Sequence, residues 1–533
     1  MGIVADKIKG LVTLILGQTK AEKNSSDQLR LIEDAVQRSA IYEIGSFALS
    51  DDEQIRQTAL IAINNALGVL SPVQLAKLDL LIREVSPYLG ENRKRWFQLS
   101  AADLSTFESA ELSFPFFGLA SFHSSGYVRE SAIKRLKENH DGRELPYLLI
   151  RLNDWVAPVQ QAAEKEIFER IRIDYAHHWV SNLALLRRLI LASRKNHQPF
   201  GEAVFALLRQ PECQPALLAG LVDKDVQVRK LCFQLAAESN MWNLRELTER
   251  SLSDTHPGIR LWGARQVSKL DASSIALLLD VLRKDRFMPV RREYLRFVVD
   301  KLPDRAIDDL KFALFDSSAS LRWEAAQLLQ QAQPFDLLMF YRRAFDDMRD
   351  ENLIGALSGL GENGKEEDAP LVLRYIDHPR NKVRKTALRS LSNLSAQEYL
   401  PIFLAKLLDQ STAVSNQAGK ALADKSRFVQ GSRLWEAFCE TPRSNLKLRI
   451  LLLIFRLPKW ESIPFLLNAV ADSDQMIAQA SIKLINRWCI QFNRQFAAAS
   501  AAQLDAAKQA FEGCKHRLPE LWQKNLAFYL KEN

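Results

Sequence analysis

The segment LVDKDVQVRKLCFQLA, residues 221–236, contains the pattern that decides the fold. An apolar pair is followed by an Asp near a turn, then by an apolar residue, an Arg and a helix with apolar positions on one face. The same order returns in LSDTHPGIRLWGARQV (252–267), LRKDRFMPVRREYLRFVV (282–299), LFDSSASLRWEAAQLL (314–329) and YIDHPRNKVRKTALRSL (375–391). Such self-similarity predicts a stack of like units in place of one compact core.

The apolar residue before the Arg defines position 0 of each unit. From Val228 onward, the residue numbers of successive positions 0 differ by 31, 31, 31, 32, 30, 31, 34 and 29. Two earlier steps, of 73 and 69, are each close to two periods, and we expect one degenerate unit in each. About fourteen units would then fill most of the chain. The twelve assigned positions 0 are Ile55, Val128, Val159, Val228, Ile259, Val290, Leu321, Leu353, Val383, Val414, Leu448 and Ile477.

Each unit is predicted to contain two helices. Asp, Ser, Asn and Pro cluster just before position 0, where they suit the turn and the N-cap of the second helix. Positions 0, +4, +5 and +8 are mostly apolar or small, which places them on one helical face. Only 20 Gly and 19 Pro occur among 533 residues, and this scarcity favours helices over β-structure. The sequence therefore predicts an all-α fold.

This pattern resembles the HEAT repeat, in particular the short bacterial type of about 30 residues that is also called phycobilisome-lyase-like. The resemblance implies a right-handed α-α superhelix with about fourteen helix pairs, in which Asp at −5 and Arg at +1 form a structural ladder between units. A partly buried Arg needs acceptors that a turn Asp can supply, so we assign both columns to architecture. The columns are Asp154, Asp223, Asp254, Asp285, Asp316, Asp409 and Asp472, and Arg56, Arg129, Arg229, Arg260, Arg291, Arg322, Arg384 and Arg449.

The predicted HEAT-repeat solenoid spans residues 49–496, with capping helices at 1–48 and 497–533. The pattern is irregular around 70–125, where four Phe residues lie between Phe114 and Phe122. This segment is either a tightly packed degenerate unit or an inserted site. The first twenty residues fit an amphipathic capping helix, with an interfacial membrane anchor as the alternative. No run of about 18 apolar residues predicts a membrane span.

The composition restricts the compartment and the partners. A formal net charge of +8, from 72 Lys and Arg against 64 Asp and Glu, permits an acidic partner without requiring one. The sparse cysteines form no CxxC pair and are predicted to be buried, reduced thiols of a cytoplasmic protein. They are Cys213, Cys232, Cys439, Cys489 and Cys514.

No catalytic or metal-binding motif is found. The eight histidines include no HExxH motif and none stands at metal-ligand spacing from Cys, so we predict no metal, cofactor or catalytic residue. His256 and His378 precede Pro in predicted turns, and GLGENGKEE (359–367) lacks the spacing of a phosphate-binding loop. Among HEAT-type enzymes, the deoxyhypusine hydroxylases use His-Glu dipeptides, which this sequence lacks. A HEAT-type lyase or DNA glycosylase is the least favoured alternative, since a repeat alone transfers no activity.

Position +6 of the second helix lies about 180° from the buried arc and should face solvent. Seven of its twelve residues are basic and none is acidic. In HEAT solenoids the second helices line the concave side, so the resemblance implies that this column forms a ridge along a groove. With neighbouring exposed positions, the candidate binding ridge is Lys134, Lys165, Lys230, Trp262, Arg265, Arg292, Arg296, Trp323, Lys385, Arg389, Lys420 and Lys483.

Three interpretations of this ridge remain. Long basic side chains can simply solvate an exposed helix face. They can also bind an acidic protein surface or a nucleic-acid backbone. Since no catalytic constellation accompanies them, the sequence predicts a non-enzymatic scaffold or adaptor that binds a partner protein and is monomeric by itself. A nucleic-acid-binding HEAT protein is the alternative.

Overall fold

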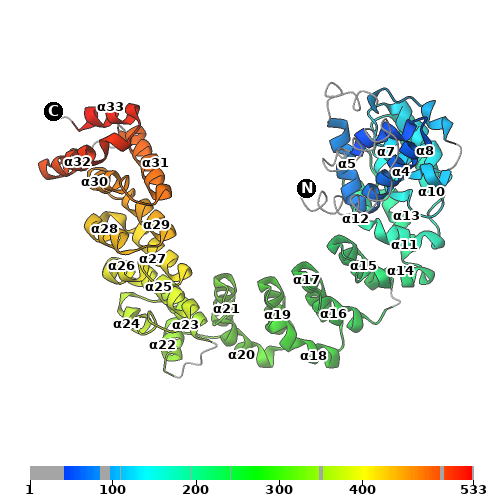
Figure 1. Cartoon of the computed structure of the whole chain (residues 1–533). Coiled ribbons are helices and arrows are strands. Elements are labelled where there is room, and N and C mark those ends of the chain that lie inside the picture. Colours follow the sequence, from blue (N-terminus) through cyan, green and yellow to red (C-terminus); the bar gives the residue numbers. More distant parts are fainter. Residues whose placement is uncertain are drawn as a thin grey trace. The chain divides into compact units, whose positions relative to one another are not determined.

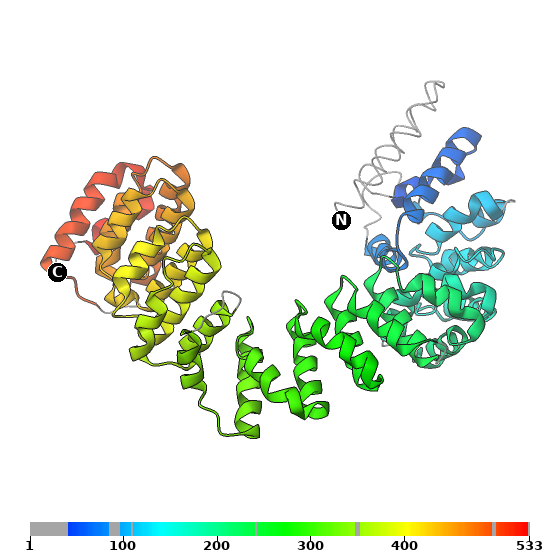
Figure 2. The same cartoon turned by 90° about the horizontal axis from the view of Figure 1, so that it is seen from below.

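The computed structural model describes residues 41–84, 96–107, 110–192, 194–239, 242–346, 352–492 and 497–530. It divides the chain into two compact units, Met1–Leu282 and Arg283–Asn533 (Figures 1 and 2). Every regular element in these ranges is a helix, and most helices alternate as first and second members of stacked pairs. The predicted all-α stack of helix pairs is thereby confirmed. The predicted amphipathic helix of the first twenty residues lies outside the described ranges.

In the first unit, α4, α8, α10, α12, α15 and α17 are the second helices, each preceded by its first helix. The gap between Val159 and Val228 contains the expected extra pair, α11 and α12, together with α13. In the earlier gap the described residues add only α5, which packs against α9 and α12 instead of continuing the alternation. The bounds are α3 (Ile41–Gly45), α4 (Glu53–Gly68), α5 (Pro72–Glu84), α7 (Ala110–Ala120), α8 (Gly126–Leu136), α9 (Leu145–Arg151), α10 (Ala157–Phe168), α11 (Ala176–Ser181), α12 (Leu183–Ile190), α13 (Gln198–Leu208), α14 (Gln214–Gly220), α15 (Val226–Glu238), α16 (Leu244–Leu252), α17 (Pro257–Gln266) and α18 (Ala272–Arg283).

In the second unit, the second helices α25, α27 and α29 form one row, and the first helices α26, α28 and α30 lie beside it (Figure 1). At the C-terminal end α32 packs on α30, and α33 contacts α31. The bounds are α19 (Met288–Lys301), α20 (Pro303–Ala313), α21 (Ala319–Ala332), α22 (Leu337–Ala344), α23 (Leu353–Asn363), α24 (Ala369–Leu373), α25 (Asn381–Ser395), α26 (Leu400–Leu407), α27 (Thr412–Asp424), α28 (Gly431–Glu440), α29 (Ser444–Ile454), α30 (Lys459–Ala469), α31 (Gln475–Gln491), α32 (Ala501–Cys514) and α33 (Glu520–Tyr529).

The second helices begin and bury their faces as the pattern predicts. In α15 the Asp225 carboxylate caps the N-terminus by accepting from the Gln227 backbone N–H at 2.7 Å. In α17 this role falls to His256, whose Nδ1 accepts from the Gly258 N–H at 3.1 Å, which confirms His256 as a turn residue. The apolar face of α25, at positions 0, +4, +5 and +8, is completely buried. Its members are Val383, Ala387, Leu388 and Leu391.

Several Asp–Arg pairs of the two columns form the predicted ladder, whereas Arg56 pairs with Glu53 of its own helix and Arg322 with Glu362. Arg229 donates from Nε and Nη2 to the two carboxylate oxygens of Asp254 at 2.8 and 3.0 Å, 25 residues further along the chain. Its Nη1 donates to the Asp223 carbonyl oxygen at 2.8 Å, so one guanidinium ties its own turn to that of the next unit. Such bidentate, charge-assisted bonds are among the stronger polar contacts. The same arrangement joins Arg129 to Asp154, Arg291 to Asp316 and Arg384 to Asp409.

Acid should therefore weaken this fold. Burial raises the pKa of the ladder carboxyls, but the hydrogen bonds and charge of their arginines, together with a hydrogen bond from a backbone N–H, outweigh burial and hold the pKa of Asp154, Asp254 and Asp409 below the usual value. A depressed folded-state pKa contributes stability above the unfolded-state pKa, and this is lost as the pH falls through the folded value. We expect the urea midpoint to fall between about pH 5 and pH 2. A midpoint unchanged over this range would contradict the stabilising role of the ladder.

One second helix, α29, has a different register from the one predicted. In α29, Leu446 is 3% exposed and occupies position 0, and Lys447 at +1 pairs with Asp472 at 2.7 Å. Leu448 and Arg449 were therefore assigned wrongly, because the apolar–basic dipeptide occurs twice in succession and only packing distinguishes the copies. In α23 every residue from 355 to 361 is buried, so burial is equally compatible with Leu353 as position 0. With the correction in α29 the last two steps in residue number become 32 and 31.

The irregular 70–125 segment contributes a packed core. Phe114, Phe116, Phe117 and Phe122 are at most 4% exposed, and Phe114 and Phe122 both contact the Tyr147 ring. This favours the tightly packed alternative over an inserted site. Aromatic density replaces the regular apolar columns here, which is why the repeat pattern fades.

The cysteines follow the prediction with one exception. Cys213, Cys232, Cys489 and Cys514 are buried free thiols, whereas Cys439 on α28 is exposed. The prediction was wrong for Cys439 because that side chain lies on the outer face of a first helix. Among the described helices, none combines the length and apolarity needed to cross a bilayer.

Candidate protein-binding surface

The candidate ridge residues are mostly at the surface, as predicted from position +6. The half-buried ones are Lys230, Trp262 and Arg292, and the exposed ones are Lys134, Lys165, Arg265, Arg296, Trp323, Lys385, Arg389, Lys420 and Lys483. Two other members of the +6 column, Gly359 and Ile454, are buried. Ile454 is buried because of the shifted register of α29, whereas Gly359 lies in a stretch of α23 in which every residue from 355 to 361 is buried. The residue at +6 of α29 is Leu452, which is 54% exposed.

In the first unit the ridge is partly engaged in local contacts. Lys134 pairs with Glu130 one turn earlier in α8, at 2.7 Å. Trp262 packs against the Phe233 ring with centroids 5.5 Å apart, so it serves the interface between α15 and α17. Lys165 is exposed on α10 and Lys230 half-buried on α15.

At the start of the second unit, the positive charge of the ridge residues is also partly neutralised. Arg292 and Arg296 on α19 both pair with Glu324 on α21, at 2.7 and 2.9 Å. Trp323 lies beside this cluster and is 67% exposed. One carboxylate thus compensates part of the charge of two ridge arginines.

Uncompensated charge is concentrated on the second helices α25, α27, α29 and α31. Together they contain nine Lys and Arg residues and a single carboxylate, Asp424. Two of the nine, Arg384 and Lys447, are used by the ladder. The first helices α24, α26, α28 and α30 carry three basic and three acidic residues. The positive potential therefore belongs to the second-helix layer and not to the unit as a whole.

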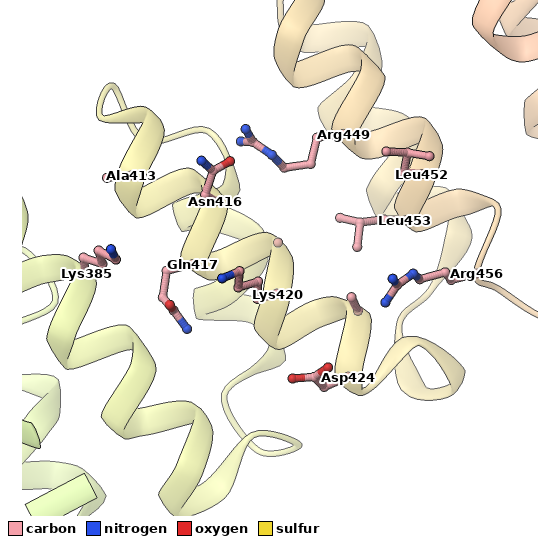
Figure 3. A pocket seen from close by; sticks show the side chains of 12 residues that line it. Lys385, Ala413, Asn416, Gln417, Lys420, Asp424, Arg449, Leu452, Leu453 and Arg456 are labelled. Atoms are coloured by element: carbon pink, nitrogen blue, oxygen red, sulfur yellow. The ribbon is translucent and has the colours of Figure 1, made fainter. Parts of the chain in front are cut away.

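A hollow of about 620 Å³ lies within this layer, lined by residues of α25, α27 and α29 (Figure 3). It brings together two ridge residues, Lys385 and Lys420, with Arg456 and Asn416. Figure 3 shows Asn416 and Arg449 at one end of the hollow, Asp424 and Arg456 at the other, and Lys420 between them. The sequence predicted Lys385 and Lys420 at the surface but missed Asn416, Arg449 and Arg456.

Arg449 is the distinctive group of this hollow. Its Nη1 donates to the Ser415 hydroxyl oxygen at 2.7 Å, and that hydroxyl donates to the Leu407 carbonyl oxygen at 2.6 Å. In the described part of the chain no carboxylate forms an ion pair with it. Burial, and the charge of Arg443, hold the pKa of Arg449 below its usual range. A half-buried cation without a counter-ion favours an anion that comes from elsewhere.

Gly419 makes room for this arginine. A Cβ built at Gly419 would lie 3.0 Å from Arg449 Cδ, so a side chain there would push the guanidinium stem away. The sequence signal that could have revealed the site is the doubled motif of Lys447 and Arg449. Only one of the two can enter the ladder, which leaves the other for a different role.

Comparisons with known proteins give distant similarities only. No family model matches the chain, and no curated protein matches its sequence. Yeast importin-beta (Kap95p) is 11% identical with a TM-score of 0.35, over 92% of this chain and 67% of that one. The S. pombe condensin Cnd3–Cnd2 subcomplex is 15% identical with a TM-score of 0.30, over 97% and 90%. Kap121p bound to Ste12p is 12% identical with a TM-score of 0.30, over 97% and 57%.

This chain spans about two thirds of the length of two of the Kap95p chains that it matches, 66% and 67%. At such identities and TM-scores, neither a family nor an activity is shown. The function must therefore be argued from the residues of this chain.

Proposed function

We propose that this protein is a non-enzymatic interaction scaffold that binds an acidic partner protein through the second helices α25, α27, α29 and α31. The observation that carries the proposal is the charge asymmetry of the second unit. Nine basic residues and one acidic residue lie on these helices, beside first helices in which the two signs balance. A hollowed surface whose charges nearly all have the same sign attracts an oppositely charged partner and steers its approach.

A protein partner is favoured over nucleic acid by apolar side chains within the basic layer. Leu452 occupies a ridge position in α29 and is 54% exposed. Ile490 in α31 is 64% exposed and follows Lys483 by seven residues, which places both on one helical face. Exposed aliphatic side chains gain nothing from a phosphate backbone but can be buried by a protein. Nucleic-acid binding is kept as an outcome of the test.

Charge reversal should abolish partner binding. The test variant is Lys385→Glu, Lys420→Glu and Lys483→Glu together, since all three are exposed. Its matched control is Arg433→Glu, Lys515→Glu and Lys524→Glu, which are exposed outside the four helices. We expect wild type and control to capture the same protein from the native host, in a salt-sensitive manner, and the test variant to lose it.

A purified partner should then bind the test variant at least about tenfold more weakly than the control. Equal capture by the test variant would contradict the proposal. A gel-shift series with DNA and RNA belongs to the same experiment. Nucleic-acid binding that falls steeply with salt and is abolished only in the test variant would replace a protein partner by a nucleic acid.

The proposal has further parts. We propose that the repeat is of the short bacterial HEAT type, which its period of about 31 residues supports. We also propose a cytoplasmic monomer whose solenoid, residues 49–496, is flanked by caps at 1–48 and 497–533. Four buried free thiols support a reducing compartment.

A further inference from the structure

We infer that the hollow between α27 and α29 binds an Asp or Glu side chain of the partner together with an apolar side chain next to it, and that Arg449 is its anchor. This inference rests on the proposed function, since it names the chemistry of the segment that the second helices bind. The occupant is a segment of another protein in which acidic and aliphatic residues adjoin.

Arg449 presents the donors that a carboxylate requires. A guanidinium has five N–H donors in a planar fork, and the described residues account for one of them, in the bond to Ser415. The remaining edge can donate two parallel hydrogen bonds to one carboxylate. The Ser415 bond fixes the orientation, because the Ser415 hydroxyl is itself held by the Leu407 carbonyl. The arginine is thus positioned before the partner arrives, which reduces the entropy lost on binding.

The surroundings of Arg449 select for an anion at this end of the hollow. Asn416 lies beside the guanidinium, and Lys420 also lines the hollow (Figure 3). The single carboxylate, Asp424, lies at the opposite end near Arg456 (Figure 3). A bound acidic side chain is therefore drawn to the Arg449 end, because at the other end the nearby Asp424 offsets the positive charge of Arg456. This difference sets the direction of the bound segment.

The apolar requirement comes from α29. Leu452 and Leu453 line the hollow next to Arg449, and Leu452 is 54% exposed. An aliphatic side chain placed on Leu452 would be removed from water together with it. Because Arg449 and Leu452 are three residues apart on one helix, they meet adjacent side chains of a bound segment.

The test uses a fluorescent peptide in which Asp and Leu alternate, titrated with the full chain and followed by polarisation. Peptides of alternating Ser and Leu, and of alternating Asp and Ser, are the matched controls. We expect the Asp-Leu peptide to bind at least about tenfold more tightly than either control. We expect Arg449→Met to weaken it about tenfold or more, while Arg433→Met on α28 leaves it unchanged.

Arg449→Lys guards against a folding artefact, because it keeps the charge within the same helix. It should fold like wild type by circular dichroism. On a logarithmic scale, its loss of peptide affinity should be about half of the loss in Arg449→Met, because an ammonium cannot bind a carboxylate bidentately. Three results would overturn the inference: no peptide binding by wild type, equal binding by Arg449→Met, or tighter Arg449-dependent binding of single-stranded DNA. If Arg449→Met still captures the native partner while the charge-reversal variant loses it, the proposed function stands and only this inference fails.

Discussion

Replacing Asp154 by Asn should destabilise the first unit by about 3–5 kcal/mol, because it leaves buried arginines without their counter-ion. Asp154 is fully buried and accepts two hydrogen bonds from Arg129, at 2.9 and 2.8 Å. It also accepts from Arg151 at 2.8 Å and from the Val156 backbone N–H at 3.0 Å. An amide has one acceptor oxygen in place of two and carries no charge, so it cannot satisfy these donors.

The matched control is Asp409→Asn in the second unit. Its partner Arg384 is 16% exposed, against 0% for Arg129, so water can replace part of the lost contact. We expect a loss of about 1–2 kcal/mol there. Because repeat stacks open locally, native-state hydrogen exchange is the suitable measurement, and Asp154→Asn should release α8, α9 and α10. Equal losses of stability in the two variants would show that burial does not determine how much an Arg–Asp pair of the ladder contributes to the fold.

The second large effect is expected from Gly355→Ala. A Cβ at Gly355 would lie 2.0 Å from the carbonyl oxygen and 2.4 Å from the carbonyl carbon of Phe315, both backbone atoms that cannot rotate away. The helix must therefore shift, and we expect a loss of about 3 kcal/mol or more by urea unfolding. A Cβ at Gly359 or Gly361 of the same helix would likewise clash, with Tyr341 and Ser390 respectively. The glycines of α23 thus permit close packing, which gives GLGENGKEE a structural role in place of the phosphate loop that it superficially resembles.

Gly68→Ala is the control for this prediction. Gly68 ends α4 in the other unit, and nothing lies within 4 Å of the Cβ position. Alanine has the higher helix propensity, so the variant should be neutral or up to about 1 kcal/mol more stable. A similar loss in both variants would mean that the effect is not due to the contact with Phe315.

Much of the fold could be predicted from the sequence because the same pattern recurs in many units, so that an assignment made in one unit can be checked in the others. The buried column of α25 and the ladder between Arg229 and Asp254 follow from residue type and spacing alone. The part that could not be predicted occurs where the local signal is ambiguous. Leu446-Lys447 and Leu448-Arg449 satisfy the same rule, and α5 follows no rule of the repeat.

The candidate site likewise has one feature that the sequence predicts and one that it does not. The exposure of Lys385, Lys420 and Lys483 was predictable, since position on a helical face depends only on the turn of about 100° per residue. Unlike Arg292 and Arg296, none of the three forms an ion pair among the described residues, and this depends on which helix packs next and where Glu324 lies. No sequence pattern predicts that distance.

By itself, the sequence determined the architecture: an all-α stack of helix pairs with a regular period, held by a ladder whose Asp and Arg columns can be written down in advance. Periodicity suffices for this because two spacings are nearly constant along the chain: the number of residues between positions on one helical face, and the number of residues in one helix pair. The tertiary structure alone decided that Lys447 enters the ladder and that Arg449 is left facing a hollow opened by Gly419. The physical reason is that an ion pair and a cavity each depend on side chains from two helices, and their juxtaposition exists only after the helices have packed.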